Sequence, residues 1–343
     1  MAVCLFQPKD QPRWDEFVKH SPEATLYHQI GWKEVIEKSF GQRGYYWLAE
    51  DPTGKIIGIL PVVHLKSLLF GSFMVSLPYF NYGGVCAQED GTCMELMDAA
   101  IEEAKRAGAA HIEFRHQMPI ETDLPVKTAK VSMRLELPAS ADVLFQSFDA
   151  KLRSQIRRPT KEGMEATIGG VEALDSFYDV FSKNMRDLGT PVYSKSFFKN
   201  IMDVFPGISW ICTVYKEGVP VASGFLLGFK ETLEIPWASS LSEYNRFSPN
   251  MLLYWTVLKF ACERGFKTFD FGRSTEGEGT YRFKAQWGAK PVPLYWHYWI
   301  GKEGKLPELN PKNPKYSAAI NLWKKLPVGL TKMIGPLIVR NLP

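Results

Sequence analysis

GFKTFDFGRSTEGEGTYRFKAQWGAKP, residues 265–291, predicts a buried strand, a glycine-broken loop and a short helical segment, in that order. Phe269 and Phe271 supply apolar side chains to the strand. Asp270 interrupts them, so its carboxylate needs hydrogen-bond donors or a place at a sheet edge or cleft. The glycines allow a sharp turn or a close approach to a ligand. A strand end followed by such a loop often forms a site, although a plain surface loop has the same pattern.

The helical segment after the loop contains four candidate site residues, Tyr281, Arg282, Phe283 and Lys284. Lys284 lies between aromatic residues, where its ammonium can stabilise the negative charge of a tetrahedral intermediate. A surface lysine with its stem on Trp287 fits the same sequence. Asp270 is a candidate base, and Arg273 is a candidate substrate-binding residue. Glu113, the acid of an earlier predicted strand, is expected to accept hydrogen bonds from the backbone.

The composition is that of a soluble globular chain, with 343 residues of which 45% are hydrophobic and 23% are charged, a length typical of two domains. The net charge of +4 does not indicate a dedicated nucleic-acid binder, although a local basic patch can bind phosphate. The five cysteines form no CxxC pair and the six histidines no HExxH, so neither a metal site nor a disulfide framework is predicted. No signal peptide or spanning segment is evident, so a cytoplasmic location is expected.

The predicted elements follow the same order twice, which favours a duplicated α/β unit. Helix AAIEEAKRAG leads into strand AAHIEFR in the first round, and LKFACERG leads into FKTFDFGR in the second. Glu113 and Asp270 each lie five residues after the glycine that ends the helix. Helices are predicted over 12–20, 26–40, 92–107, 141–158, 175–188, 197–205 and 250–264. Strands are predicted over 45–50, 55–65, 73–87, 109–117, 128–137, 209–216, 219–229, 232–239, 267–271 and 294–300.

Two further segments carry candidate binding residues. If residues 151–161 are helical, Arg153, Arg157 and Lys161 form one basic face with Arg158 beside it, suited to phosphate; a solvated surface face is the alternative. Asn250 lies at the start of the helix at 250–264, whose free amides favour an anion, although capping without a ligand is common. Trp237, on the preceding strand, is also a candidate substrate-binding residue.

The repeated unit, the helix LRSQIRRPTKEG and the segments DFGRS and GTYRFKAQWGA resemble the FemABX-like branch of the GNAT superfamily over roughly 27–300. LGTPVYSKSFF and the tail LWKKLPVGLTKMIGP are similar to FemAB-related proteins that accompany exosortase and PEP-CTERM exopolysaccharide systems. The resemblance implies an α/β (α+β) fold with two tandem GNAT-like domains, each a mixed sheet flanked by helices. We expect these domains at 1–140 and 141–300.

The resemblance also implies a function, namely transfer of an acyl or aminoacyl group to an amine of a peptidoglycan or exopolysaccharide precursor. Phe283 and Lys284 match the family's Phe-Lys pair, in which the lysine assists acyl transfer. Arg153, Arg157 and Arg158 match its basic helix, which would bind a phosphate-bearing precursor or donor. No bound cofactor is implied, and the donor would be acyl-CoA or aminoacyl-tRNA.

Two departures from the family pattern matter, and a separate donor motif is only approximately matched. Pro159 stands where related sequences often have alanine, and the coiled-coil insertion that handles tRNA in some members is missing. The acetyl-CoA pattern Gln/Arg-x-x-Gly-x-Gly/Ala is approached at 273–279, with a spacing one residue too long. A non-catalytic scaffold for polysaccharide assembly and an acyl-CoA-dependent N-acetyltransferase are therefore kept as alternatives.

The tail, 301–343, contains apolar residues at helical spacing with lysines among them. The apolar residues are Trp323, Leu326, Leu330, Met333, Ile334 and Leu337, and the lysines are Lys324, Lys325 and Lys332. The pattern predicts that the tail packs back on the first domain, or that it lies on the inner surface of a membrane that carries lipid-linked precursors.

Overall fold

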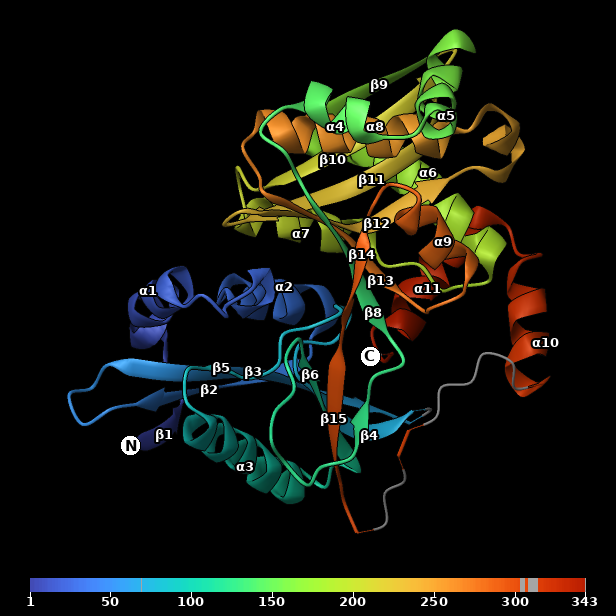
Figure 1. Cartoon of the computed structure of the whole chain (residues 1–343). Coiled ribbons are helices and arrows are strands. Elements are labelled where there is room, and N and C mark those ends of the chain that lie inside the picture. Colours follow the sequence, from blue (N-terminus) through green and yellow to red (C-terminus); the bar gives the residue numbers. More distant parts are fainter. Residues whose placement is uncertain (69, 303–305, 308–313, 343) are drawn as a thin grey trace. The chain divides into compact units, whose positions relative to one another are not determined.

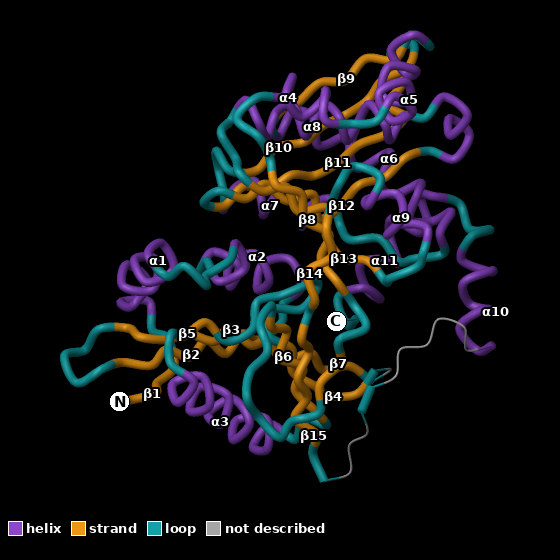
Figure 2. Tube along the Cα trace, viewed as in Figure 1, coloured by secondary structure: helices purple, strands orange, loops and turns teal. Residues whose placement is uncertain are grey.

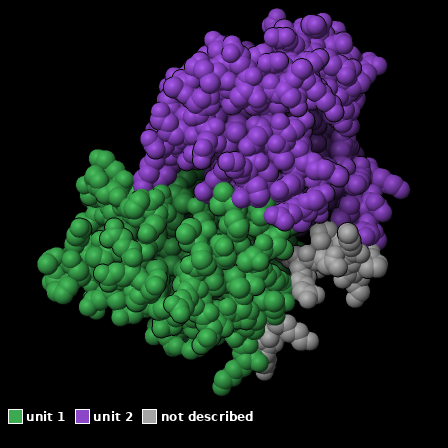
Figure 3. Space-filling model, in the orientation of Figure 1, with its two compact units in different colours: residues 1–131, 292–309, 340–343 green, residues 132–291, 310–339 purple. Residues whose placement is uncertain are grey.

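A computed structural model of the chain describes residues 1–68, 70–302, 306–307 and 314–342. The chain forms two compact units, shown in different colours in Figure 3. The first unit comprises 1–131, 292–309 and 340–343, and the second comprises 132–291 and 310–339. Each unit is built on its own mixed sheet with helices on both faces (Figures 1 and 2).

The first sheet has the strand order β1-β2-β3-β4-β6-β15-β7, with β5 paired to β3 beside this path. Its strands are β1 (Ala2–Leu5), β2 (Arg43–Glu50), β3 (Ile56–Ser67), β4 (Gly71–Val75), β5 (Cys86–Ala87), β6 (His111–His116), β7 (Val126–Lys127) and β15 (Tyr295–Ile300). Helices α1 (Gln11–His20) and α2 (Gly31–Phe40) cover one face and α3 (Asp90–Ala107) the other (Figure 1).

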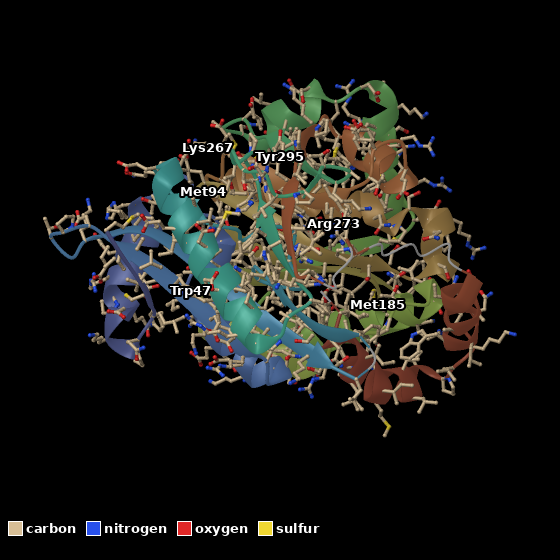
Figure 4. All side chains as sticks on the ribbon, turned by 90° about the horizontal axis from the view of Figure 1, so that it is seen from below. Trp47, Met94, Met185, Lys267, Arg273 and Tyr295 are labelled. Atoms are coloured by element: carbon tan, nitrogen blue, oxygen red, sulfur yellow. The ribbon has the colours of Figure 1, made fainter. Side chains whose placement is uncertain are left out.

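The packing of α3 follows from two side-chain periods, that of the helix itself and the two-residue period of the strand it covers. Leu96, Ala100 and Ala104 recur every four residues on the buried stripe of α3. They pack with Tyr45 and Trp47, which lie two residues apart on β2 and therefore point to the same face of the sheet. Figure 4 labels Trp47 on this side of the sheet, beside α3. One helix stripe and one sheet face together form the core layer on the α3 side of the first sheet.

The second sheet has the strand order β14-β8-β13-β12-β11-β10-β9. Its strands are β8 (Val131–Glu136), β9 (Met164–Gly169), β10 (Ser209–Lys216), β11 (Val219–Phe229), β12 (Thr232–Ser240), β13 (Thr268–Ser274) and β14 (Lys290–Pro293). Its helices are α4 (Ala141–Ser147), α5 (Ala150–Lys161), α6 (Leu174–Leu188), α7 (Lys195–Val204), α8 (Pro249–Glu263), α9 (Gly279–Ala285), α10 (Pro314–Trp323) and α11 (Val328–Val339). Helices α4, α5 and α8 lie on one face and α6 and α7 on the other, and α9 packs on β13.

The repetition predicted from the sequence is confirmed by the topology. In the first unit α3 joins the parallel strands β4 and β6, and in the second α8 joins the parallel strands β12 and β13. Glu113 pairs in register with Val75, and Asp270 pairs with Glu234. The helix of each unit is followed by a glycine in the left-handed region, with φ of 65° at Gly108 and 80° at Gly265.

The two units divide the chain differently from the predicted domains 1–140 and 141–300. Strand β15 was assigned to the second domain, but it pairs with β6 in the first sheet, and the Tyr298 hydroxyl donates to Glu113 Oε2 at 2.7 Å. Residues 132–140 belong to the second unit because β8 lies beside β13. The chain thus returns to its first unit after the last strand of the second sheet, a path that sequence order does not reveal.

Three predicted elements are interrupted in the structure. The strand predicted over 73–87 stops at Val75, because a turn follows in which Leu77 and Tyr79 have positive φ. The helix predicted over 141–158 is divided into α4 and α5, and Asp149 Oδ1 accepts from the Leu152 amide at 2.7 Å as the cap of α5. The helix predicted over 26–40 is a 3₁₀ turn followed by α2. Strands β1, β7, β9 and β14 were not predicted.

The tail helices α10 and α11 belong to the second unit, so the predicted packing on the first domain is wrong for them. Arg186 of α6 donates to the Leu326 carbonyl at 3.0 Å, and the Lys332 ammonium lies 2.9 Å from Asp179 Oδ1. The chain rejoins the first unit at Arg340, whose carbonyl accepts from Gln42 Nε2 at 2.8 Å. Residues 303–305, 308–313 and 343 of the predicted tail lie outside the described residues. Among the helices that are described, none has the length and apolarity needed to cross a bilayer.

Gly335 provides a test of how tightly α11 is seated. A Cβ atom at this position would lie 2.8 Å from the backbone nitrogen of Val192, which cannot move aside easily. We expect Gly335→Ala to lower the free energy of unfolding by about 1–3 kcal/mol in urea denaturation. Gly329→Ala is the matched control in the same helix, because no atom lies within 4 Å of the added methyl. Equal effects of the two substitutions would contradict this packing.

Candidate active site at the end of strand β13

The candidate site lies where the parallel pairing of β12 and β13 ends. The paired register runs from Thr232 and Thr268 to Glu234 and Asp270, and both strands then continue without pairing to each other. The carboxylates of Glu234 and Asp270 are neighbours at this level, with 2% and 0% of the residue exposed. Beyond this level β13 no longer pairs with β12, so its peptide groups on that side are available to other partners.

Asp270 is fully buried, and both of its carboxylate oxygens accept hydrogen bonds. Its Oδ1 accepts from the Ser132 hydroxyl at 2.6 Å and from the Gly272 amide at 2.7 Å, and its Oδ2 accepts from Arg134 Nε at 3.1 Å. Ser132 and Arg134 lie two residues apart on β8, the neighbour of β13, so they share a face and both reach the same carboxylate. With both oxygens occupied and the side chain inaccessible, this geometry favours a positioning role for Asp270 over the role of base.

Lys284 is buried on α9 and binds the end of β13. Its Nζ donates to the carbonyls of Gly272 and Arg273, both at 2.9 Å, and the residue is 8% exposed. Gly272 has φ of 75°, which turns the chain where these two successive carbonyls meet one ammonium. An ammonium has three hydrogens, so one remains for a substrate oxygen.

The electrostatics of Lys284 reflect its burial. Loss of solvent lowers the pKa of Lys284 to about 8; the carboxylates of Asp270 and Glu234 oppose this shift and the charge of Arg273 adds to it. The ammonium is therefore charged at neutral pH and sits close to its titration range. Such a perturbed group is typical of functional sites.

Aromatic packing fixes α9 in place. The ring of Phe283 lies 5.1 Å from Tyr254 of α8 in an edge-on arrangement, and Tyr254 stacks on Phe271 at 5.5 Å. Phe283, predicted to bind substrate, is thus the residue that packs the Lys284 helix on its neighbours. Tyr281 is half-buried, and Arg282 is exposed. Arg273 is exposed where β13 nears its end and is labelled in Figure 4.

Two other predicted binding residues have structural contacts. Asn250 Nδ2 donates to Ser240 Oγ at 3.0 Å and so joins the start of α8 to the end of β12. Trp237 lies in an aromatic cluster, 5.1 Å from Phe198 and 5.7 Å from Phe225. These contacts account for both residues without a ligand.

The predicted basic face lies on α5, which packs against α8 and the edge strand β9. Arg157, Arg158 and Lys161 are exposed and Arg153 is half-buried. The Arg157 guanidinium lies 5.1 Å from the Phe145 ring centre, and Arg158 donates to the Arg246 carbonyl at 2.7 Å. Strand β9 is separated from β13 by three strands, so no contact in the described structure joins this face to Lys284.

Sequence reasoning missed three residues of the site: Glu234, Ser132 and Arg134. Glu234 shows the same signal as Asp270, an acid within an apolar strand, and could have been found by it. Ser132 and Arg134 lie well over a hundred residues before Asp270, and nothing in their own stretch indicates their partner.

A pocket of about 490 Å³ lies beyond the end of α9. Its lining residues are Leu135, Glu136, Leu137, Pro138, Val143, Leu144, Ser147, Phe148, Asp149, Gln286, Trp287 and Gly288. The size suits a small ligand and most of the walls are apolar. Within the described ranges no group of three or more histidine, cysteine or acidic side chains could hold a metal ion, and the five cysteines are unbridged.

Known proteins share this architecture. A family model for the acetyltransferase (GNAT) domain matches residues 146–285. The chain is 22% identical to the UDP-N-acetylmuramoylpentapeptide-lysine N(6)-alanyltransferase of Weissella viridescens, covering 81% of this chain and 88% of that protein. It is 21% identical to the lipid II:glycine glycyltransferase of Staphylococcus haemolyticus, covering 80% and 87%. The crystal structure of FemX superposes with a TM-score of 0.68 at 17% identity, covering 88% of this chain and 98% of that one.

The two mixed sheets, each with a helix-joined parallel pair, are two tandem GNAT-like domains, and the buried lysine lies in the domain that the family model matches. The matching domain model and both curated relatives are named as acyl- or aminoacyltransferases. The chain is similar to FemABX-like proteins of the GNAT fold over most of its length, in agreement with the resemblance seen in its sequence.

The depressed pKa of Lys284 predicts a pH-dependent stability. Between pH 8 and 10.5 an unfolded lysine still holds its proton, whereas the buried one has released it, so the folded state gains relative stability as pH rises. Relative to Lys284→Met, the wild-type free energy of unfolding should increase by about 3 kcal/mol across this range. Urea denaturation of both proteins at several pH values measures the difference. If the difference in unfolding free energy between the two proteins does not change with pH, then the charged form of Lys284 is not buried.

Asp270→Asn tests the anchoring role of this carboxylate. The substitution removes the negative charge opposite Arg134 and places an amide against donors, so we expect a loss of about 1–3 kcal/mol in the free energy of unfolding. Because Asp270 raises the pKa of Lys284, the pH-dependent stability gain should also begin at a lower pH. Asp203→Asn, which breaks an exposed ion pair with Lys199, is the control and should cost less than about 1 kcal/mol. If the stability gain begins at the same pH in Asp270→Asn as in the wild type, then Asp270 does not raise the pKa of Lys284.

Proposed function

We propose that this chain transfers an aminoacyl group from aminoacyl-tRNA to an amine of a phosphate-bearing cell-envelope precursor. The observation that carries the proposal is the Lys284 ammonium, held by two carbonyls with one hydrogen left for a substrate. The two curated relatives support the reaction class, since one is named an alanyltransferase and the other a glycyltransferase, and both names specify a cell-wall precursor.

In this reaction the acceptor amine attacks the ester carbonyl of the donor. A carbon–nitrogen bond forms, and the carbonyl oxygen takes the negative charge of the tetrahedral intermediate. Lys284 donates its remaining hydrogen to that oxygen and stabilises the charge. The carbon–oxygen ester bond then breaks, and the ribose hydroxyl leaves with the proton that the amine releases, directly or through water. The products are an amide and free tRNA.

The buried carboxylates have a supporting role in this scheme. Asp270 and Glu234 both favour the charged form of Lys284, which the oxyanion requires. Asp270 also holds the Gly272 amide at 2.7 Å, and Gly272 supplies one of the two carbonyls that orient the ammonium. Because neither oxygen of Asp270 is open to a substrate, the scheme assigns it no proton transfer.

The exposed cations of α5 support a donor or acceptor that carries phosphate. Arg157, Arg158 and Lys161 project from one helix, and guanidinium groups bind phosphate oxygens with two parallel hydrogen bonds. An acyl-CoA donor also carries phosphate, so it is the competing donor in the test. The acceptor can be a peptidoglycan or an exopolysaccharide precursor, and the link to exosortase and PEP-CTERM systems stays a prediction.

The test is a transfer assay with labelled donors and two acceptors. Aminoacyl-tRNA, acetyl-CoA and longer acyl-CoAs are each combined with a lipid-linked peptidoglycan precursor or a nucleotide-linked amino sugar, and the amide product is quantified. We expect product with aminoacyl-tRNA and the peptidoglycan precursor. Lys284→Met should lower kcat/KM about 10²–10³-fold, the loss expected for one oxyanion donor, while acceptor affinity is retained.

Lys290→Met is the matched control, because Lys290 is an exposed lysine on β14 of the same unit and lies outside the site. Its kcat/KM should equal that of the wild type. Product only from an acyl-CoA donor would replace the proposal with an N-acyltransferase of that donor. Acceptor binding without product from any donor would favour the scaffold alternative. Full activity of Lys284→Met would remove the assigned role of the lysine.

A further inference from the structure

The tail helices expose an apolar surface, defined here as the tail face. It consists of Leu330, Met333 and Leu337 of α11, which are 41%, 73% and 63% exposed, and Leu322 of α10 is a further exposed leucine of the tail, at 65%. The three residues of α11 are spaced i, i+3 and i+7, so they lie on one side of that helix. Such a run of exposed aliphatic side chains marks an interaction site, since singly scattered apolar residues are the ordinary case.

The opposite side of α11 is firmly seated on the second unit. Thr331, Gly335 and Val339 are buried at successive helical turns. Lys332 forms an ion pair with Asp179 of α6 at 2.9 Å, and Gly335 approaches the Val192 backbone so closely that a Cβ would not fit. This seating holds the helix in a fixed rotation, with the tail face turned away from α6.

The charged side chains of the tail segment 314–343 itself all have one sign. From residue 314 to residue 343 the sequence contains five cations and no acidic residue. The cations are Lys315, Lys324, Lys325, Lys332 and Arg340. Lys324 and Lys325 are exposed in the link between α10 and α11, beside the apolar side chains. An exposed aliphatic stripe bordered by lysines is the pattern of a helix that lies in the interface of an anionic membrane.

We propose that the tail face binds the surface of an anionic lipid bilayer, with Leu330, Met333 and Leu337 among the acyl chains and Lys324 and Lys325 on the lipid phosphates. Helix α11 has 12 residues and so is about 18 Å long, too short to span the hydrocarbon core but long enough to lie in its plane.

Two features of the tail face favour a bilayer over a protein partner. The face is an exposed helix side made of leucine and methionine only, and Trp323, the aromatic residue of α10 nearest to it in sequence, is 8% exposed. Protein–protein hot spots are enriched in tryptophan, tyrosine and arginine, which the tail face lacks. Leucine with lysine is sufficient for a fluid anionic surface, where shape complementarity is not required.

This inference deepens the proposed function, because a lipid-linked acceptor would be met at the same surface. It does not depend on catalysis, so it can fail or succeed independently of the proposed transfer.

The experiment is sedimentation of the full chain with vesicles of phosphatidylcholine alone or mixed with phosphatidylglycerol. The wild type should sediment with the mixed vesicles, and added salt should weaken this binding. The double variant Met333→Glu/Leu337→Glu should reduce the partition coefficient at least about tenfold, because two carboxylates would have to enter the acyl region. Lys324→Ala/Lys325→Ala should reduce binding to the mixed vesicles and weaken its salt dependence.

Val219→Glu is the matched control, since Val219 is 47% exposed on β11 of the same unit and lies outside the tail face. It should bind vesicles as the wild type does. Thermal unfolding must show that the double variant is folded, and transfer to a water-soluble acceptor should be unaffected by it. Failure of the wild type to bind mixed vesicles would overturn the proposal, as would equal binding by the double variant. A dimer in light scattering that the double variant dissociates, with vesicle binding unchanged, would assign the tail face to a second copy instead.

Discussion

The second unit depends on one buried carboxylate. Asp270 has no exposed surface, so each of its oxygens must be satisfied by the protein, and Ser132, Arg134 and the Gly272 amide provide the donors. Two of these donors come from β8 and one from β13 itself, so the carboxylate joins the neighbouring strand to the turn at Gly272. The turn at Gly272 then presents the Gly272 carbonyl, to which the Lys284 ammonium donates. The position of the candidate catalytic ammonium is therefore set by a charge that does not contact solvent.

In the first unit, a buried acid at the matching position has a structural role alone. Glu113 occupies the matching position after α3, and it is satisfied by Arg115 Nε at 2.5 Å and the Tyr298 hydroxyl at 2.7 Å. Burial alone would raise the pKa of Glu113, but the charge of Arg115 and these two bonds outweigh it and lower the pKa. After β6 the described chain forms no helix before β7, whereas after β13 it forms α9 with Lys284. Among the described residues, the acid-bearing strand is therefore followed by a helix with a buried lysine in the second unit alone.

The tail shows that a single apolar pattern can serve two purposes. Its apolar residues recur at helical spacing, which predicted either packing or a membrane surface. The structure divides α11 by side: Thr331, Gly335 and Val339 are buried, whereas Leu330 and Met333 are 41% and 73% exposed. Periodicity shows that a helix has an apolar character, but the shape of the surface beneath it decides which residues are covered.

By itself the sequence determined most elements, the repeated order of helix and strand, and the candidate site with Asp270 and Lys284. These features rest on local signals, namely periodicity, glycine at helix ends and an acid within an apolar strand. Only the tertiary structure decided that Asp270 is sealed by residues far away in the chain, that Trp237 and Asn250 are held by structural contacts, and that β15 returns to the first sheet. Each of these depends on pairing between distant segments, for which a stretch of sequence carries no local signal, because the partner is chosen by packing and hydrogen bonding across the whole unit.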